Sequence, residues 1–227
     1  MGQAQRTGIF LDKDGALLDD VPCSVDPRAM RFAPGVPKAL GRLARLDLPL
    51  IVVSNQTDVA MGKTSETTML DVERGLQRMF ADCGAVLSGF HYCPHHPDAA
   101  VDAYRRACTY RKPMPGLLLK AAANHGIDTT GSWMIGDMLD DVEAGLCCGC
   151  RTVLINDGNE TRWEISARRL PNFVVEHIEE AADIIVLAHE GGLPALREAA
   201  TSVAGHQPDQ PFHLPRSRQP NLRYRRN

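Results

Sequence analysis

Short apolar runs rich in β-branched residues alternate with helix-like stretches along this chain, and this alternation limits its possible folds more than any other feature. The runs cover residues 9–11, 48–53, 133–135, 152–155 and 173–175. Such runs, with little polar alternation, are typical of strands buried on both faces of a parallel sheet. We therefore predict an α/β fold, Rossmann-like, with three layers and a central parallel sheet.

The stretches between these runs carry helix signals. We predict helices over residues 36–46, 65–80, 115–125 and 140–148. Ser65 is a good N-terminal cap, Pro115 suits the first position of a helix, and Gly126 suits a C-terminal stop.

One folded domain accounts for most of the 227 residues. This length supports one full-sized α/β core, and we predict that it spans residues 1–190. The remaining residues, 191–227, should form a basic and largely disordered extension. Residues 205–227 contain five Arg and four Pro but only one acid, Asp209. Because basic tails of this kind are usually solvated, we do not expect a nucleic-acid partner.

Targeting signals and disulfides are not evident in the sequence. No run approaches the roughly 18 apolar residues of a membrane span, and the first six residues lack the apolar core of a signal peptide. Seven Cys is an odd number, which argues against a framework of disulfides and leaves packing or metal binding as their role. We expect a cytoplasmic monomer that acts on a small molecule and has no membrane partner.

Polar side chains follow three of the predicted strands. Asp12-Lys13-Asp14-Gly15 follows the first, Ser54-Asn55-Gln56-Thr57 follows the second, and Gly136-Asp137 follows the third. Taken alone, the first tetrapeptide is equally compatible with an ordinary turn rich in Asp and Gly. Parallel strands, however, bring their carboxyl ends to one edge of the sheet, so we expect these groups to converge.

The chemistry of the converging groups indicates phosphoryl transfer. The carboxylate of Asp12 is ionised at neutral pH and can act as a nucleophile, while Asp14 can transfer a proton. A phosphate ester is itself anionic, so the site needs positive charge. Lys112 could neutralise the phosphoryl oxygens, and Mg²⁺ held by Asp12 and Asp137 could offset the remaining repulsion.

The order and spacing of these residues resemble the haloacid dehalogenase (HAD) superfamily, whose phosphatases carry Asp-x-Asp-Gly, a Ser or Thr, a Lys, and Gly-Asp-x-x-x-Asp. All four motifs are present in order. The resemblance implies Asp12 as nucleophile and Mg²⁺ ligand, Asp14 as general acid/base and as a Mg²⁺ ligand through its carbonyl, and Asp137 as a further Mg²⁺ ligand. Asp141 would be a weaker ligand or would lie behind the ligands. The expected phosphate-binding residues are Ser54, Asn55, Arg111 and Lys112.

Loops rather than a cap domain should select the substrate. Only about 20 residues separate Asp14 from Pro34-Gly35, which leaves no block long enough for a large cap. The expected fold is therefore the HAD type without a large cap domain. The loops that would surround the site cover residues 19–31, 54–63 and 93–111.

One of these loops resembles the zinc loop of the heptose bisphosphate phosphatases and the related histidinol phosphatases, which read Cys-x-His and then Cys-x-Cys-Arg-Lys-Pro. Cys93, His95 and Cys108 match the pattern, but Tyr110 stands where the last Cys belongs. The three could hold a structural Zn²⁺ with water or His91 as the fourth ligand. The alternative is a loop without metal, held by proline and aromatic packing.

The resemblance to the heptose bisphosphate phosphatases covers residues 8–185. It implies Mg²⁺-dependent hydrolysis of heptose 1,7-bisphosphate to heptose 1-phosphate through an aspartyl phosphate. The family pattern Ser-Gly-x-Ala-Arg-Gly is here Thr57-Asp58-Val59-Ala60-Met61-Gly62, so an acid replaces the Gly and Met61 replaces the Arg. Histidinol phosphate as substrate, and a phosphosugar-binding protein of low activity, are the alternatives.

Overall fold

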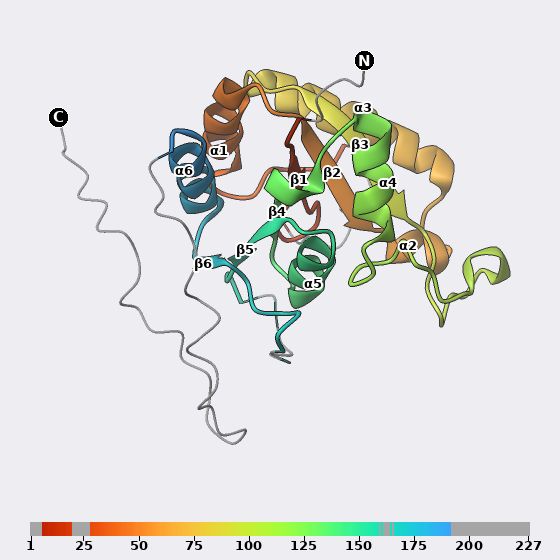
Figure 1. Cartoon of the computed structure of the whole chain (residues 1–227). Helices are drawn as coiled ribbons and strands as arrows, with labels where there is room; N and C mark the ends of the chain where they lie inside the picture. Colours follow the sequence, from red (N-terminus) through yellow and green to blue (C-terminus); the bar gives the residue numbers. More distant parts are fainter. Residues whose placement is uncertain (1–5, 20–27, 159, 161–163, 165, 192–227) are drawn as a thin grey trace, which may run out of the picture. The chain divides into compact units, whose positions relative to one another are not determined.

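Six parallel strands form the central sheet of this computed structural model (Figure 1), which describes residues 6–19, 28–158, 160, 164 and 166–191. In sheet order, the strands are β3 (Leu87–Cys93), β2 (Leu50–Asn55), β1 (Ile9–Leu11), β4 (Trp133–Gly136), β5 (Arg151–Ile155) and β6 (Phe173–Val175). The predicted α/β fold with a parallel sheet is confirmed. All of the described residues belong to one compact unit within residues 1–194.

β1 lies at the centre of the sheet, between β2 and β4. Its last residue, Leu11, pairs with Val52 of β2 and with Ile135 of β4. The chain builds β2 and β3 on one side of β1 and then crosses to build β4, β5 and β6 on the other. In open parallel sheets, ligands bind outside the carboxyl ends of the strands where the order reverses, which places Asp12 at that position.

Helices cover both faces of the sheet. The helices are α1 (Val36–Leu43), α2 (Thr57–Ala60), α3 (Glu66–Asp82), α4 (Gly116–His125), α5 (Leu139–Cys147) and α6 (Ile178–His189), with 3-10 turns over Ala44–Leu46, Asp102–Tyr104 and Thr129–Gly131. α1, α3 and α6 pack on the face that carries Ile9 and Leu11. α4 and part of α5 pack on the opposite face, around Phe10. Successive residues of β1 therefore point into two different cores, which explains its uninterrupted apolar sequence.

Local signals place the helix ends close to the predicted positions. The Ser65 hydroxyl accepts a hydrogen bond from the Thr68 N–H (3.2 Å) at the start of α3. Gly126 ends α4 with a φ of 62°, the left-handed conformation that favours glycine. The predicted helix over 36–46 is α1 followed by a 3-10 turn, and the one over 140–148 is α5, which begins and ends one residue earlier.

The sequence analysis missed β3. Leu87–Cys93 reads Leu-Ser-Gly-Phe-His-Tyr-Cys and contains no Val, Ile or Thr. Its buried residues recur every third position instead of every second, and its pairing with β2 shifts in register between Leu50 and Ile51. Residues 94–111 form only one 3-10 turn and no cap domain, while most of the segment between Asp14 and Pro34 lies outside the described residues. The predicted loop over 19–31 lies mostly outside the described residues, as does the extension beyond residue 191.

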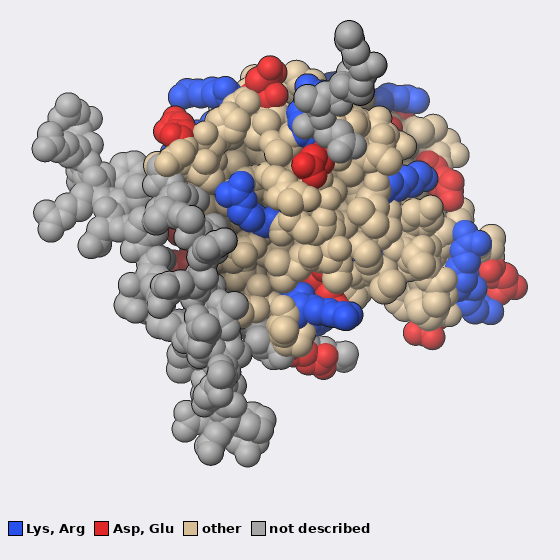
Figure 2. Space-filling view, viewed as in Figure 1, with Lys and Arg blue, Asp and Glu red and all other residues tan. Residues whose placement is uncertain are grey.

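Basic and acidic side chains are interspersed on the face shown in Figure 2, and neither sign forms a continuous patch there. Among the described residues, no helix is both long and apolar enough to cross a membrane.

Candidate active site

The carboxyl ends of β1, β2 and β4 bring the predicted site residues to one edge of the sheet. Asp12 directly follows β1, and its N–H donates to the Ile135 carbonyl of β4 (2.9 Å). Ser54 is the next-to-last residue of β2, and Asp137 directly follows β4. Asp12, Ser54 and Asp137 are all buried. The expected convergence therefore follows from strand register alone.

Lys112 supplies the positive charge at this edge. Its Nζ lies 2.6 Å from Asp12 Oδ1 and 2.5 Å from Asp141 Oδ1, and it also donates to the Val53 carbonyl (3.2 Å). The side chain is 3% exposed. Burial by itself lowers the pKa of Lys112, but the carboxylates of Asp12 and Asp141 outweigh this and hold its pKa above the usual value. Lys112 is therefore a permanent cation.

Asn55 fixes the backbone of Lys112. Its Nδ2 donates to the Lys112 carbonyl (3.0 Å), and its Oδ1 accepts from the Lys112 N–H (3.0 Å). Both polar ends of the amide are thus used to fix the backbone of a residue that comes from another loop. The predicted phosphate contact of Asn55 stays a prediction, and in the structure its side chain positions the lysine.

Three carboxylates meet beside Lys112, and we call Asp12, Asp137 and Asp141 the carboxylate cluster. One oxygen of each lies within 4.8 Å of the others, and all three residues are buried. Burial raises the pKa of Asp12 to about 7, Asp141 adds to the rise, and Lys112 opposes it. A cluster of hard oxygen donors of this kind fits Mg²⁺, whose charge would favour the ionised form of Asp12.

Asp141 lies closer to the centre of the site than the sequence analysis suggested. Its Oδ2 accepts the Met138 N–H (3.1 Å) at the start of α5, while its Oδ1 faces Lys112. Gly136 makes room for it: a Cβ at Gly136 would lie 2.3 Å from Asp141 Oδ2. The Gly in Gly136-Asp137 is therefore needed because the carboxylate of Asp141 packs directly against the end of β4.

Asp14 is held next to the cluster by its own set of contacts. The Lys13 ammonium pairs with Asp14 Oδ1, and Gln56 Nε2 donates to Asp14 Oδ2 (3.0 Å) and to Ser54 Oγ (2.7 Å). Asp14 is 30% exposed, so a proton can reach it from solvent. Gln56 was not predicted, although its position directly after Ser54 and Asn55 marked it as part of the same polar loop.

Arg111 lies between two loops. Its Nη2 donates to Thr57 Oγ1 (3.1 Å) at the start of α2, and its Nη1 donates to the His95 carbonyl (3.2 Å). Both partners are neutral oxygens, so these bonds orient the guanidinium without cancelling its charge. Thr57 was not predicted as a site residue.

Residues 93–111, which we call the cysteine loop, bring together the three predicted zinc ligands. Cys93 Sγ lies 3.7 Å from His95 Nδ1 and 3.8 Å from Cys108 Sγ. The suggested fourth ligand, His91, is directed elsewhere, because its Nε2 contacts Nε2 of His125 in α4 (3.1 Å). Burial raises the pKa of Cys93 to about 11, and such a thiol needs a metal ion or another cation to ionise.

Tyr110, at the position of the missing ligand, packs against α4. A Cβ built at Gly116 would lie 3.2 Å from the Tyr110 ring, and Lys120 Nζ lies 5.4 Å from the ring centroid. The backbone N–H of Tyr110 donates to Cys108 Sγ (3.4 Å). Two thiols and one imidazole are a donor set that suits Zn²⁺, with one position left for another ligand.

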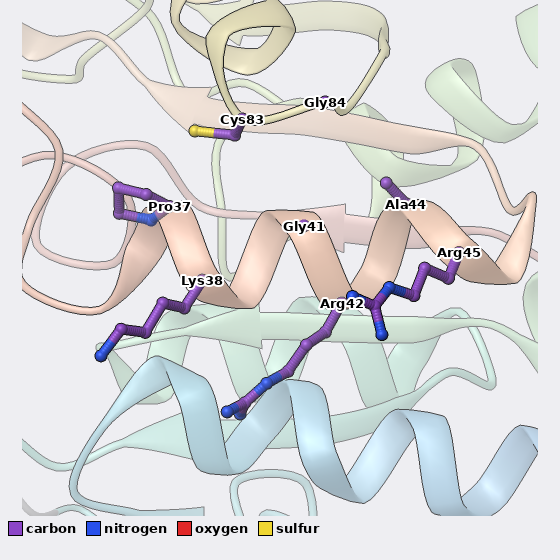
Figure 3. A pocket seen from close by; sticks show the side chains of 8 residues that line it. All are labelled: Pro37, Lys38, Gly41, Arg42, Ala44, Arg45, Cys83 and Gly84. Carbon is purple, nitrogen blue, oxygen red and sulfur yellow. The ribbon is translucent and has the colours of Figure 1, made fainter.

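A groove of about 590 Å³ lies away from this edge, along α1 and the turn after α3 (Figure 3). Pro37, Gly41 and Ala44 face Cys83 and Gly84, while the Arg42 side chain projects toward α6. Arg42 bonds there to Asp183 (2.7 Å) and to the Glu179 carbonyl (3.3 Å). The groove follows from the small residues on α1 and contains none of the site residues described above.

Comparison with known proteins places this arrangement in a family. The profile of the HAD-hydrolase-like family matches residues 109–181. The D-glycero-β-D-manno-heptose-1,7-bisphosphate 7-phosphatase of Photorhabdus laumondii is 35% identical over 173 residues, which are 76% of this chain and 91% of that protein. The chain belongs to this family of HAD phosphatases.

Further relatives agree with that assignment. The enzyme of the same name from Escherichia coli K12 is 36% identical over 151 residues, covering 66% of this chain and 79% of that protein. The crystal structure of the D,D-heptose 1,7-bisphosphate phosphatase from B. bronchiseptica, complexed with magnesium and phosphate, is 26% identical with a TM-score of 0.66, over 80% of this chain and 99% of that one. The protein is thus a phosphoric monoester hydrolase of the HAD type, a class that uses Mg²⁺.

Proposed function

We propose that this HAD phosphatase hydrolyses heptose 1,7-bisphosphate to heptose 1-phosphate through a phosphorylated Asp12. The observation that carries the chemistry is the meeting of Asp12, Lys112 and the other cluster carboxylates at one buried point. The relationship to proteins named heptose-1,7-bisphosphate 7-phosphatase supports the substrate.

In the first half of the proposed reaction, an Asp12 oxygen attacks phosphorus and forms a carboxyl–phosphate bond. The bond from phosphorus to the sugar oxygen breaks, and Asp14 gives its proton to the leaving oxygen. In the second half, water attacks the aspartyl phosphate, Asp14 takes the proton of the water, and Asp12 and inorganic phosphate are released. Lys112 stabilises the charge on the phosphoryl oxygens.

The carboxylate cluster would hold the Mg²⁺ of this reaction. Asp12 and Asp137, together with the Asp14 carbonyl, are the proposed ligands, and Asp141 lies near enough to contribute. Bound Mg²⁺ would supply positive charge against the repulsion between Asp12 and the phosphate dianion. Gln56 and the Lys13 ammonium orient Asp14 for its proton transfers.

The part of the substrate beyond the reacting phosphate would meet Arg111. Met61 replaces the arginine of the family pattern, so the cation at Arg111 becomes more important for an anionic substrate. Thr57 and the His95 carbonyl hold its guanidinium between the α2 segment and the cysteine loop. Ser54 completes the proposed phosphate contacts from the end of β2.

We also propose that Cys93, His95 and Cys108 hold a structural Zn²⁺. Their donor atoms lie within 4.8 Å of one another. The metal would fix the cysteine loop and so the direction of Arg111 and Lys112, which follow Cys108 in the chain. Zinc analysis of the purified protein tests this, and a content near zero would refute it.

Phosphate release tests the function. Purified protein with Mg²⁺ should release phosphate from heptose 1,7-bisphosphate more efficiently than from histidinol phosphate, and an Asp12→Asn variant should lose at least about 10³-fold in rate because the amide cannot attack. A preference for histidinol phosphate would move the substrate assignment to the alternative. Equal rates for the variant and the parent would remove Asp12 from the mechanism.

A further inference from the structure

Glu160 is a buried carboxylate beside the candidate metal site, and the proposed mechanism does not use it. It comes from the segment after β5, 23 residues beyond Asp137 in the chain, and is 8% exposed. Its Oε2 accepts a hydrogen bond from the Leu139 N–H (2.9 Å). A buried carboxylate is costly unless hydrogen bonds hold it, so a specific purpose for this contact is expected.

The contact lies at the start of α5, directly after the metal-site strand. The Met138 N–H donates to Asp141 Oδ2 (3.1 Å), and the Leu139 N–H donates to Glu160. Two consecutive amides after Asp137 are therefore each fixed by a carboxylate. Anionic side chains are favoured at this end of a helix, because its first N–H groups have no partner within the helix.

We infer that Glu160 is a positioning residue that fixes the Asp137–Leu139 turn so that Asp137 and Asp141 are held at the spacing that binds the divalent cation. This inference rests on the proposed metal site. Glu160 acts through the backbone: its carboxylate fixes Leu139, and Asp141 fixes Met138, which leaves Asp137 little freedom to rotate away. Outer partners that orient metal ligands commonly account for a tenfold to hundredfold difference in metal affinity.

A purely structural role for Glu160 would predict a different result. Substitution of Glu160 would then lower the stability of α5 without changing the affinity of the folded protein for metal. The same helix offers a matched control in Glu143, whose Oε2 pairs with Arg169 Nε (2.7 Å) on its partly exposed side. Glu143→Gln alters a carboxylate of α5 that touches neither the Asp137–Leu139 turn nor the cluster.

Two substitutions separate geometry from charge. Glu160→Asp keeps the charge, but its side chain is one methylene too short to reach the Leu139 N–H. Glu160→Gln loses the charge but keeps an oxygen that can accept this hydrogen bond. We expect Glu160→Asp to bind Mn²⁺, used as a probe for the site, about tenfold more weakly, and Glu160→Gln and Glu143→Gln to stay within about threefold of the parent.

Isothermal titration of the full chain with Mn²⁺ measures these affinities, and the Mg²⁺ concentration for half-maximal phosphatase activity should shift in parallel. Unchanged affinity in Glu160→Asp would overturn the inference, and so would a tenfold loss in Glu160→Gln with none in Glu160→Asp, because Glu160 would then act by charge. Asp137→Asn distinguishes a failure of the proposed metal site from a failure of the proposed role of Glu160. If it binds Mn²⁺ as the parent does, the proposed metal site itself is wrong; if it alone loses binding, only the role of Glu160 fails.

Discussion

The carboxylate cluster and the cysteine loop lie at the same end of the sheet, but the structure builds them in different ways. The cluster draws Asp12 and Asp137 from the ends of β1 and β4 and Asp141 from α5, and all three are buried, as is the neighbouring Lys112. The cysteine loop draws its three donors from one segment, of which only Cys93 is buried. Changes in the cluster should therefore be severe, whereas the loop can lose a ligand and still keep its course through other contacts.

The loop and the cluster are nevertheless joined through Arg111 and Lys112. Arg111 bonds to the loop carbonyl of His95, and the next residue is the cation of the cluster. Asn55 fixes the Lys112 backbone from β2. The position of the lysine thus depends on the sheet as well as on the loop, so we expect the site geometry to persist with Tyr110 at the position where the family pattern has a Cys.

The largest effect is expected for Lys112→Met, which breaks the cluster. It removes the ammonium that faces Asp12 and Asp141 and the charge that stabilises the phosphoryl group. We expect kcat/KM to fall by about 10³-fold and the free energy of unfolding without Mg²⁺ to fall by about 3 kcal/mol.

Steady-state kinetics and urea unfolding measure the two effects of Lys112→Met. Lys120→Met, which removes an exposed lysine from α4, is the control and should leave both nearly unchanged. Activity within tenfold of the parent for Lys112→Met would contradict its place in phosphate binding.

Gly136→Ala should have the next largest effect, because the new methyl group would occupy the position of the Asp141 carboxylate. Displacing Asp141 should lower kcat/KM by about tenfold to a hundredfold and cost about 1–3 kcal/mol of stability. Gly145→Ala is the matched control. Its Cβ would lie 2.8 Å from Met134 and Thr152 side-chain atoms in the core, so it should lower stability with little change in activity. Equal activity losses in the two variants would refute the explanation.

The sequence was most informative where strand register decides the outcome. Asp12, Ser54 and Asp137 were expected together because each ends a predicted strand, and adjacent parallel strands end at one edge. It was least informative for contacts between distant segments. The Asn55 amide bonds to Lys112 across 57 residues and Leu139 to Glu160 across 21, and neither pairing follows from local spacing.

β3 was missed for a related reason. Residues such as Ser88, Gly89 and His91 give no strand signal of their own, and the segment is extended because β2 offers it a hydrogen-bonding edge. The same strand then carries Cys93 to the site and directs His91 toward His125. The spacing of two residues between His91 and Cys93 did not reveal that tertiary packing turns His91 away from the proposed zinc ligands.

A smaller effect is expected from loss of the contact between Thr57 and Arg111, which helps to link the two regions. Thr57→Val removes the oxygen that accepts from Arg111, and Thr57→Ser keeps it. Loss of one hydrogen bond to a charged group should raise KM for the bisphosphate by about threefold to tenfold, with kcat within about twofold. The Ser variant should restore the parent KM. A fall in kcat at unchanged KM would show that Thr57 affects the reacting groups instead of substrate binding.

Tyr110→Cys should have the smallest effect on activity and would sharpen the comparison by completing the four-ligand set of the cysteine loop. Because β1, β4 and α5 position the cluster and Asn55 of β2 also holds Lys112, we expect kcat/KM to change by less than about threefold. Zinc should be retained longer against a chelator, since a fourth thiolate replaces a weaker ligand. Tyr110→Ser is the control, because it also removes the ring from Gly116 and Lys120 but supplies no thiol. Equal rates of zinc release from the Cys and Ser variants would mean that a side chain at position 110 cannot reach the metal. The backbone of the loop, and not the identity of this residue, would then leave the fourth ligand position open.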